Sequence, residues 1–371
     1  PSSIAALLLS ATSLSASAEA KYIFYFIGDG MGIQEVASGE LFNRQILKGG
    51  DNLLMRTFPV STMISTFSAN SDVTDSAAAG TALSTGVKTK NGMLGMTPDS
   101  VAVTSMAKVL FDDGYGVGLV TTCAIDDATP AAFYTHVPNR GMVYDIGRDL
   151  ADSGYQFMAG AGLRGVNDKE GKPTDLMDHF YRQNVNVSYG YDNLDPAAQR
   201  QLLLSPFHEK DPNNTGYTID SIPGALQLAD MTAAGISHLQ RVSPEKFFMM
   251  IENGNIDHSG HSNDGATNVR EVATLDKAVK VAYDFYLQHP DETLIVITAD
   301  HETGGLYCAP NYRDPQRPFI HYTTQSHTGA PVPVFAFGPG SDRFSGVIEN
   351  IAIPSTMAEL WKLPLHRPVV K

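Results

Sequence analysis

The sequence predicts an α/β fold with a mainly parallel central sheet that has helices on both faces. Apolar segments with few charges recur along the chain, and a polar turn rich in Gly or Asp follows each one. The predicted strands are Tyr22–Ile27, Val117–Thr121, Phe247–Ile251, Leu294–Thr298 and Val332–Phe337. Segments with helical periodicity lie between them, at Val101–Phe111, Gly224–Leu239 and Val269–Leu287. Continuous apolar strands that alternate with helices are typical of a parallel sheet buried on both faces.

The composition suits a globular protein with ample material for a core. The 371 residues are 43% hydrophobic, which is enough for one large domain or two smaller ones. Because no internal repeat or long linker divides the sequence, we expect a single domain over residues 21–371. Asn, Asp and Pro are frequent at about 141–245, so insertions over the core are expected there. The net charge of −14 argues against a nucleic-acid partner, which would need a basic face.

Residues 1–20 have the pattern of a partial signal peptide. The apolar run Ile4–Leu9 is followed by Ser- and Ala-rich residues and an A-x-A cleavage pattern ending at Ala20, although a disordered tail is the alternative. We therefore expect a periplasmic or secreted protein. No later segment reaches the ~18 apolar residues of a membrane span, so none is expected in the mature form. Export would permit a disulfide, but whether Cys123 and Cys308 pair stays open.

Ser76 is the candidate nucleophile, at the start of a predicted helix. Small polar residues lead into the Ala- and Gly-rich run Ala77–Ala82, and Asp72 or Thr74 is expected to cap the first turn. Ser76 would then lie where free N–H groups and the helix dipole favour an anion. An ordinary capping serine is the alternative. Candidate metal ligands elsewhere in the chain favour the nucleophile.

Acidic and histidine side chains occur where several predicted strands end. They are Asp29, Glu252, Asp300 and His301. Asp257 and His261 are one helical turn apart, a spacing that suits one metal ion, and His327 lies in a loop before the last strand. Because ligands bind at the carboxyl ends of parallel strands, we expect these side chains to gather at one edge of the sheet.

Taken together and in order, six segments resemble the alkaline phosphatase family. They are Phe26–Gly32, Val73–Ala78 with Ser84–Thr89, Asp127–Ala132 through Arg140, Ile251–His261, Thr298–Gly305 and His327–Gly329. The resemblance implies an alkaline-phosphatase-like fold, small phosphate monoesters as substrates and a homodimer. The short interval between His301 and His327 implies that the crown insertion of larger relatives is reduced.

The resemblance also implies a role for each site residue. One zinc ion would bind Asp257, His261 and His327, and a second would bind Asp29, Asp300 and His301 and contact Ser76. A magnesium ion would bind Asp29, Thr129 and Glu252, with Asp127 in its outer coordination sphere. Substrate binding would use Arg140, oriented by Asp75, together with His258. The implied reaction is hydrolysis of a phosphate monoester through a phosphoserine at Ser76.

Two positions depart from the family pattern. Asn253 replaces the glycine that commonly follows the glutamate, so the turn behind the magnesium site is expected to differ. His258 stands where family members carry Lys, His or Trp, and next to Asp127 it leaves the occupancy of the third site open.

Other functions were weighed against this one. A sulfatase would need x-Pro-x-Arg after its nucleophile, whereas Ala77-Ala78-Ala79 follows Ser76. A phosphodiesterase would typically carry Thr as nucleophile and lack the arginine, and a phosphoglycerate mutase is a further relative in the superfamily. A non-catalytic phosphate- or metal-binding protein is the alternative from another class. An intact nucleophile beside a complete ligand set argues against it.

Overall fold

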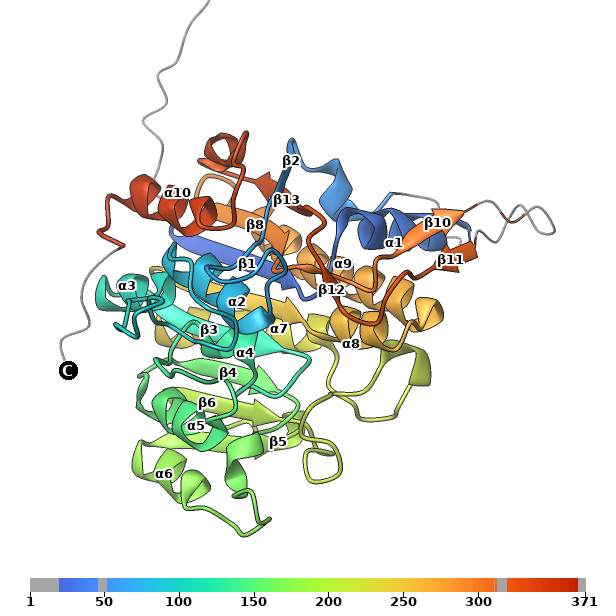
Figure 1. Ribbon diagram of the computed structural model, residues 1–371. Coiled ribbons are helices and arrows are strands. Elements are labelled where there is room, and N and C mark those ends of the chain that lie inside the picture. Colours follow the sequence, from blue (N-terminus) through green and yellow to red (C-terminus); the bar gives the residue numbers. More distant parts are fainter. Residues whose placement is uncertain (1–19, 46–51, 310, 312–318, 366–371) are drawn as a thin grey trace, which may run out of the picture.

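Nine strands form the central sheet of the molecule, with helices packed on both faces (Figure 1). The computed structural model describes residues 20–45, 52–309, 311 and 319–365. The strand order is β2-β13-β8-β1-β7-β3-β4-β6-β5. The bounds are β1 Tyr22–Gly28, β2 Val60–Ile64, β3 Gly116–Thr121, β4 Phe157–Gly160, β5 Val185–Tyr189, β6 Arg200–Leu204, β7 Phe247–Asn253, β8 Thr293–Ala299 and β13 Val332–Phe337. Among the strands of the described residues, β13 alone runs opposite to the other eight, so the prediction of a mainly parallel sheet is confirmed.

The five predicted strands are all present, and four of them extend one or two residues beyond the predicted bounds. The three predicted helices correspond to α3 (Met106–Asp112), α7 (Leu228–Val242) and α9 (Gly265–Tyr286). α3 begins five residues later than predicted, because Ser105 caps it by accepting a hydrogen bond from the Lys108 N–H at 3.3 Å.

Adjacent side chains of β1 show how the two helical layers are placed. Phe24 packs against Phe285 of α9, with ring centroids 5.5 Å apart. Tyr25 points to the other face, where it packs against Phe133 and its hydroxyl donates to the Leu83 carbonyl at 3.4 Å. The first layer contains α1 (Ile33–Gln45), α7 and α9, and the second contains α2 (Ser76–Thr85), α3, α4 (Ala128–Ala131) and α10 (Ala352–Trp361).

The stretch from 141 to 245 supplies three strands of the central sheet, which the sequence reading missed. β4, β6 and β5 extend one end of the sheet, and α5 (Val143–Asp152) and α6 (Leu176–Arg182) pack beside them. β6 carries the polar Gln201 at a buried position, where its side chain donates to the Asn186 carbonyl at 3.1 Å and to the Ser188 hydroxyl at 3.0 Å. Such internally bonded polar residues interrupt the apolar pattern that marks a buried strand.

The described residues between His301 and His327 form three short strands, and a fourth begins at His327. β9 (Glu302–Thr303) pairs with β12 (His327–Thr328), and β10 (Tyr307–Ala309) pairs with β11 (Phe319–His321). The predicted signal peptide lies outside the described residues, apart from Ala20. Both cysteines are free thiols, Cys123 buried and Cys308 partly buried. Within the described ranges, every helix is too short or too polar to cross a membrane.

Candidate active site

The carboxyl ends of four adjacent parallel strands bring the predicted acidic residues together. In the order β8-β1-β7-β3, Gly28 of β1 lies opposite Asn253 of β7 and Ala299 of β8. Asp29 and Asp300 follow directly after β1 and β8, and Glu252 is the penultimate residue of β7. The gathering predicted from the strand ends is therefore present.

Gly30 allows the chain to pass close to this cluster. Its φ of +72° lies in the left-handed region, and a Cβ there would come within 2.8 Å of the Asp257 Cα. Its N–H donates to Asp300 Oδ1 at 3.1 Å. A side chain at this position would be strained in this backbone conformation and would collide with the Asp257 backbone.

Ser76 is the first residue of α2, as predicted, but the capping residue is different. Asp75 is the N-cap, since its Oδ1 accepts from the Ala78 N–H at 3.0 Å; the prediction of Asp72 or Thr74 was wrong. The Ser76 hydroxyl is buried and lies 3.2 Å from His301 Nε2. The nucleophile candidate therefore meets a predicted metal ligand at a helix N-terminus.

Asp257, His261 and His327 form the first of two nitrogen–carboxylate clusters. Asp257 lies 3.3 Å from His261 Nε2 and 3.4 Å from His327 Nε2, and the two Nε2 atoms are 3.2 Å apart. Two ligands on one tetrahedral zinc, with bonds of about 2.0–2.1 Å, are separated by about 3.3 Å. The Nδ1 atoms lie 2.6 Å and 2.9 Å from backbone carbonyls, which directs both Nε2 lone pairs inward.

Asp29, Asp300 and His301 form the second cluster, which is buried. His301 Nε2 lies 3.4 Å from Asp29 Oδ1 and 3.2 Å from Asp300 Oδ2, again the spacing across a tetrahedral ion. Neither carboxylate oxygen has a hydrogen-bond partner, although both are buried. A buried, unpaired carboxylate oxygen is costly, so these atoms fit cation ligands.

The electrostatics of the second cluster show a need for positive charge. Burial and the neighbouring Asp300 and Asp257 carboxylates raise the pKa of Asp29 well above its usual value. Burial and Asp257 raise the pKa of Asp300 to about 7. Burial and the nearby His327 hold the pKa of His301 well below its usual value, so its imidazole is neutral and able to bind a metal.

Thr129 and Glu252 offer oxygen atoms near the second cluster. Thr129 Oγ1 is buried without a hydrogen-bond partner, and Glu252 Oε2 accepts from the Thr121 hydroxyl at 2.5 Å. Burial raises the pKa of Glu252 to about 8. Hydroxyl and carboxylate oxygens are the ligands that magnesium prefers.

Asn253, which departs from the family pattern, forms hydrogen bonds with both ends of its side-chain amide. Its Oδ1 accepts from the Thr122 hydroxyl at 3.0 Å, and its Nδ2 donates to the Glu271 carbonyl at 2.8 Å. The side chain therefore ties the end of β7 to the residue after β3 and to α9.

Arg140 lies beside the nucleophile's helix, held by two carboxylates. Its Nη1 is 3.4 Å from Asp75 Oδ2, as predicted, and its Nη2 donates to Asp127 Oδ1 at 3.0 Å. The guanidinium stays one-third exposed, so one side of it faces solvent.

Arg164 and Asp126 belong to the same network, and the sequence reading missed both. Arg164 Nη2 lies 3.3 Å from Asp127 Oδ1, the oxygen that Arg140 also binds. Asp126 is fully buried, and its Oδ2 accepts a hydrogen bond from the Arg164 backbone N–H at 2.7 Å. Burial alone would raise the pKa of Asp127, but the Arg164 and Arg140 guanidiniums lower it below its usual value. No motif marks Arg164, because it reaches the site from a separate turn.

Thr303 is a further missed residue. Its hydroxyl donates to Asp257 Oδ1 and lies 3.3 Å from His301 Nδ1, so it touches both nitrogen–carboxylate clusters. It lies in the Thr298–Gly305 segment that resembles the family, but that resemblance gave it no role.

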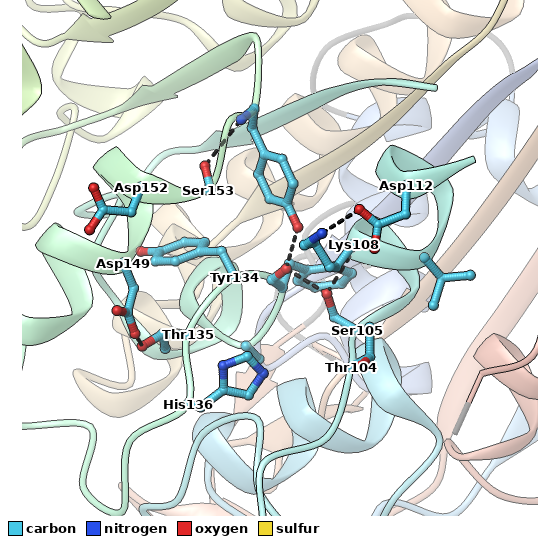
Figure 2. A pocket seen from close by; sticks show the side chains of 14 residues that line it. Thr104, Ser105, Lys108, Asp112, Tyr134, Thr135, His136, Asp149, Asp152 and Ser153 are labelled. Carbon is cyan, nitrogen blue, oxygen red and sulfur yellow. Dashed lines mark hydrogen bonds and ion pairs between the residues drawn. The ribbon is translucent and has the colours of Figure 1, made fainter. Parts of the chain in front are cut away.

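A cavity of about 380 Å³ between α3 and α5 is separate from these clusters. Figure 2 shows Lys108 and Asp112 on one side of it and Asp149 and Asp152 on the other. None of the predicted site residues lines it.

Replacing Arg164 with Ala should weaken phosphate binding by about tenfold, the equivalent of about one charge-assisted hydrogen bond. Without Arg164, Asp127 keeps Arg140 as its guanidinium partner. Because Asp127 would then bind Arg140 more strongly, Arg140 should be drawn away from the phosphate. Inhibition by inorganic phosphate measures the effect, and Arg164→Lys should recover part of it. Unchanged phosphate inhibition in Arg164→Ala would show that the residue is only structural.

Comparison with known proteins agrees with this geometry. Residues 20–163 and 168–317 match the family model described as alkaline phosphatase. The chain is 31% identical to the repressible alkaline phosphatase of Saccharomyces cerevisiae over 79% of this chain, and the match covers 56% of the yeast protein. It is 28% identical to the tissue-nonspecific isozyme of alkaline phosphatase from Gallus gallus, over 91% of this chain and 84% of that protein.

A solved structure with a similar fold is the alkaline phosphatase from the Antarctic bacterium TAB5. The two structures superpose with a TM-score of 0.81 at 28% identity, covering 93% of this chain and 99% of the other.

Proposed function

Because the chain belongs to the alkaline phosphatase family, whose members are phosphomonoester hydrolases, we propose that it hydrolyses phosphate monoesters through a phosphoserine at Ser76. The observation that carries this proposal is the position of the Ser76 hydroxyl. It lies at the N-terminus of α2, buried, and 3.2 Å from a histidine of the second nitrogen–carboxylate cluster. A non-catalytic serine would not need this combination of ligand contact and anion-binding geometry.

The donors fit two zinc ions and one magnesium ion. The clusters Asp257–His261–His327 and Asp29–Asp300–His301 offer imidazole and carboxylate at tetrahedral spacing, which suits zinc. The Thr129 and Glu252 oxygens, with Asp29, suit magnesium. When bound, zinc lowers the pKa of a coordinated hydroxyl and neutralises the oxygens around phosphorus.

The chain's own residues carry the bond-making steps. Ser76 Oγ gives its proton to solvent and attacks phosphorus in line, so the bond to the ester oxygen breaks; that oxygen takes up a proton from solvent and leaves as the alcohol. Water then attacks the phosphoserine, and the Ser76 oxygen leaves as a hydroxyl with inorganic phosphate as product. The N–H groups at the start of α2 and the Arg140 guanidinium would stabilise the negative charge on the phosphoryl oxygens.

Preference for monoesters over diesters tests the proposal. A monoester dianion has two outward oxygens that a guanidinium fork can bind, whereas a diester carries a substituent on one of them. We expect kcat/KM to be several orders of magnitude higher for p-nitrophenyl phosphate than for bis-p-nitrophenyl phosphate. Arg140→Ala should lower monoester turnover by roughly 10²–10⁴-fold and change diester turnover little.

Arg182→Ala is the matched control, since Arg182 also forms an ion pair, with Asp175 at 2.9 Å, but lies on α6 at the far end of the sheet. Equal losses on both substrates in Arg140→Ala would make Arg140 structural. A wild-type preference for the diester would instead support the phosphodiesterase reading and remove the proposed function.

A further inference from the structure

A third group of ligand side chains lies outside the two nitrogen–carboxylate clusters and contains a thiol. Cys123 follows β3, Asp127 caps α4, and His258 is on α8 (Asn255–His261). One ligand atom from each residue lies within 4.8 Å of the other two. The sequence analysis considered Cys123 only as a possible disulfide partner of Cys308, and the proposed mechanism does not use it.

The spacing of the thiol and the imidazole suits a single ion. Cys123 Sγ and His258 Nε2 are 3.8 Å apart. With a Zn–S bond of about 2.3 Å and a Zn–N bond of about 2.0–2.1 Å, a sulfur and a nitrogen on one tetrahedral zinc are separated by about 3.5 Å. The two side chains therefore need little movement to share a cation.

The local packing is built around the sulfur. A Cβ at Gly254 would lie 2.1 Å from Cys123 Sγ and 3.9 Å from the Glu252 carboxyl carbon. The missing side chain of Gly254 thus leaves space for the thiol at the turn between β7 and α8. The sulfur lies among acidic groups, since the Glu252 and Asp127 carboxylates add to burial in raising the pKa of the thiol.

We propose that Cys123, Asp127 and His258 bind a thiophilic divalent cation such as zinc, in addition to the two zinc ions of the proposed function. Thiolate, imidazole and carboxylate are ligands of zinc, whereas magnesium prefers oxygen ligands. Binding converts the thiol to a thiolate and releases its proton to solvent. The hard oxygen set of Asp29, Thr129 and Glu252 remains available for magnesium.

Asp127 links this cation to the substrate site. Its Oδ1 already accepts from Arg140 Nη2 at 3.0 Å and lies 3.3 Å from Arg164 Nη2. A cation bound to the Asp127 carboxylate competes with both guanidiniums for the negative charge of that carboxylate. Occupation of the site should therefore loosen Arg140 from Asp127 and change the affinity for phosphate.

Cobalt substitution tests the site with a spectroscopic readout. The metal-free protein is loaded with cobalt(II) while excess magnesium fills the oxygen site. The two nitrogen–carboxylate clusters contain no sulfur, so a near-ultraviolet sulfur-to-cobalt charge-transfer band reports thiolate binding alone. We expect this band in the wild type and in Cys308→Ser, with about three cobalt ions bound per chain. Cys123→Ser should lose the band and hold about two.

His258→Gln gives a second test that keeps the cysteine. It should lower the affinity for the cobalt ion that gives the band by more than about tenfold, since even the loss of an outer-sphere partner lowers metal affinity by about that factor. Thermal unfolding and the visible bands of the other two cobalt ions show whether each variant is folded. A wild type without the band, or a band that persists in Cys123→Ser, overturns the proposal. A wild type that binds no cobalt at all would instead contradict the metal centre of the proposed function.

Discussion

Removing the metals should abolish hydrolysis of p-nitrophenyl phosphate, and zinc should restore it. The Ser76 hydroxyl contacts His301 of the second cluster, whose two buried carboxylate oxygens have no hydrogen-bond partner, so the charge of bound cations is needed there. Metal analysis of the purified protein should find about two zinc ions per chain in the nitrogen–carboxylate clusters. A fully active preparation without transition metal would contradict the proposed mechanism.

Metal removal should also destabilise the fold, and more so at alkaline pH. In the metal-free protein, burial raises the pKa of Asp300 to about 7 and that of Glu252 to about 8. In the unfolded chain such groups lose their protons at about pH 4. Between these values the folded state holds more protons than the unfolded state, so its stability falls as the pH rises. Bound cations offset this cost.

Thermal unfolding measures this effect. The decrease in Tm on chelation should be larger at about pH 8 than at about pH 5.5. Asp284→Asn is a suitable comparison for Asp300→Asn, because Asp284 is exposed and pairs with Lys280 at 2.6 Å. Only Asp300→Asn should lower the zinc content and reduce the pH dependence of the metal-free protein. An equal Tm loss at both pH values would show that the buried carboxylates are not the source of the instability.

The parts of the fold that could be predicted are those with an unambiguous hydrophobic pattern. β1, β7 and β8 are continuous apolar runs, and all of their residues are buried. The strands β4, β5 and β6 could not be predicted, because a buried polar residue such as Gln201 depends on partners from another strand. Hydrophobic periodicity depends only on residues close in sequence, so it cannot show hydrogen-bond partners that come from another strand.

The same limit applies to the site. Residues in recognisable segments, such as Asp257 with His261, were identified from spacing, and the structure brings them together. Arg164 was missed because its role depends on a turn that packs against Asp126. Cys123 was missed because its partner His258 lies 135 residues away, and only the folded chain shows that they meet. The helix cap at Asp75 was missed because three nearby polar residues are equally good capping residues in sequence.

Replacement of Ser76 with Ala should give the second large loss of activity. The variant keeps the carboxylates and histidines of the proposed metal sites and the arginine proposed to bind phosphate, but it has no oxygen to form the covalent intermediate. We expect kcat to fall on the order of 10⁴-fold, with the remaining turnover coming from the surrounding charges. Zinc content should stay near the wild-type value, because Ser76 is the only lost contact of the second cluster.

The covalent intermediate itself can be trapped. Rapid denaturation at mildly acid pH in labelled phosphate should leave the label on the peptide that contains Ser76. Ser84→Ala is the matched control, since Ser84 is also buried on α2 but donates to the Ala132 carbonyl at 2.8 Å, away from the metal ligands. It should lose about 1 kcal/mol of stability and keep its label. Label on another residue would make that residue the nucleophile. Full activity in Ser76→Ala without any label would mean that water attacks the substrate directly and that Ser76 is not the nucleophile.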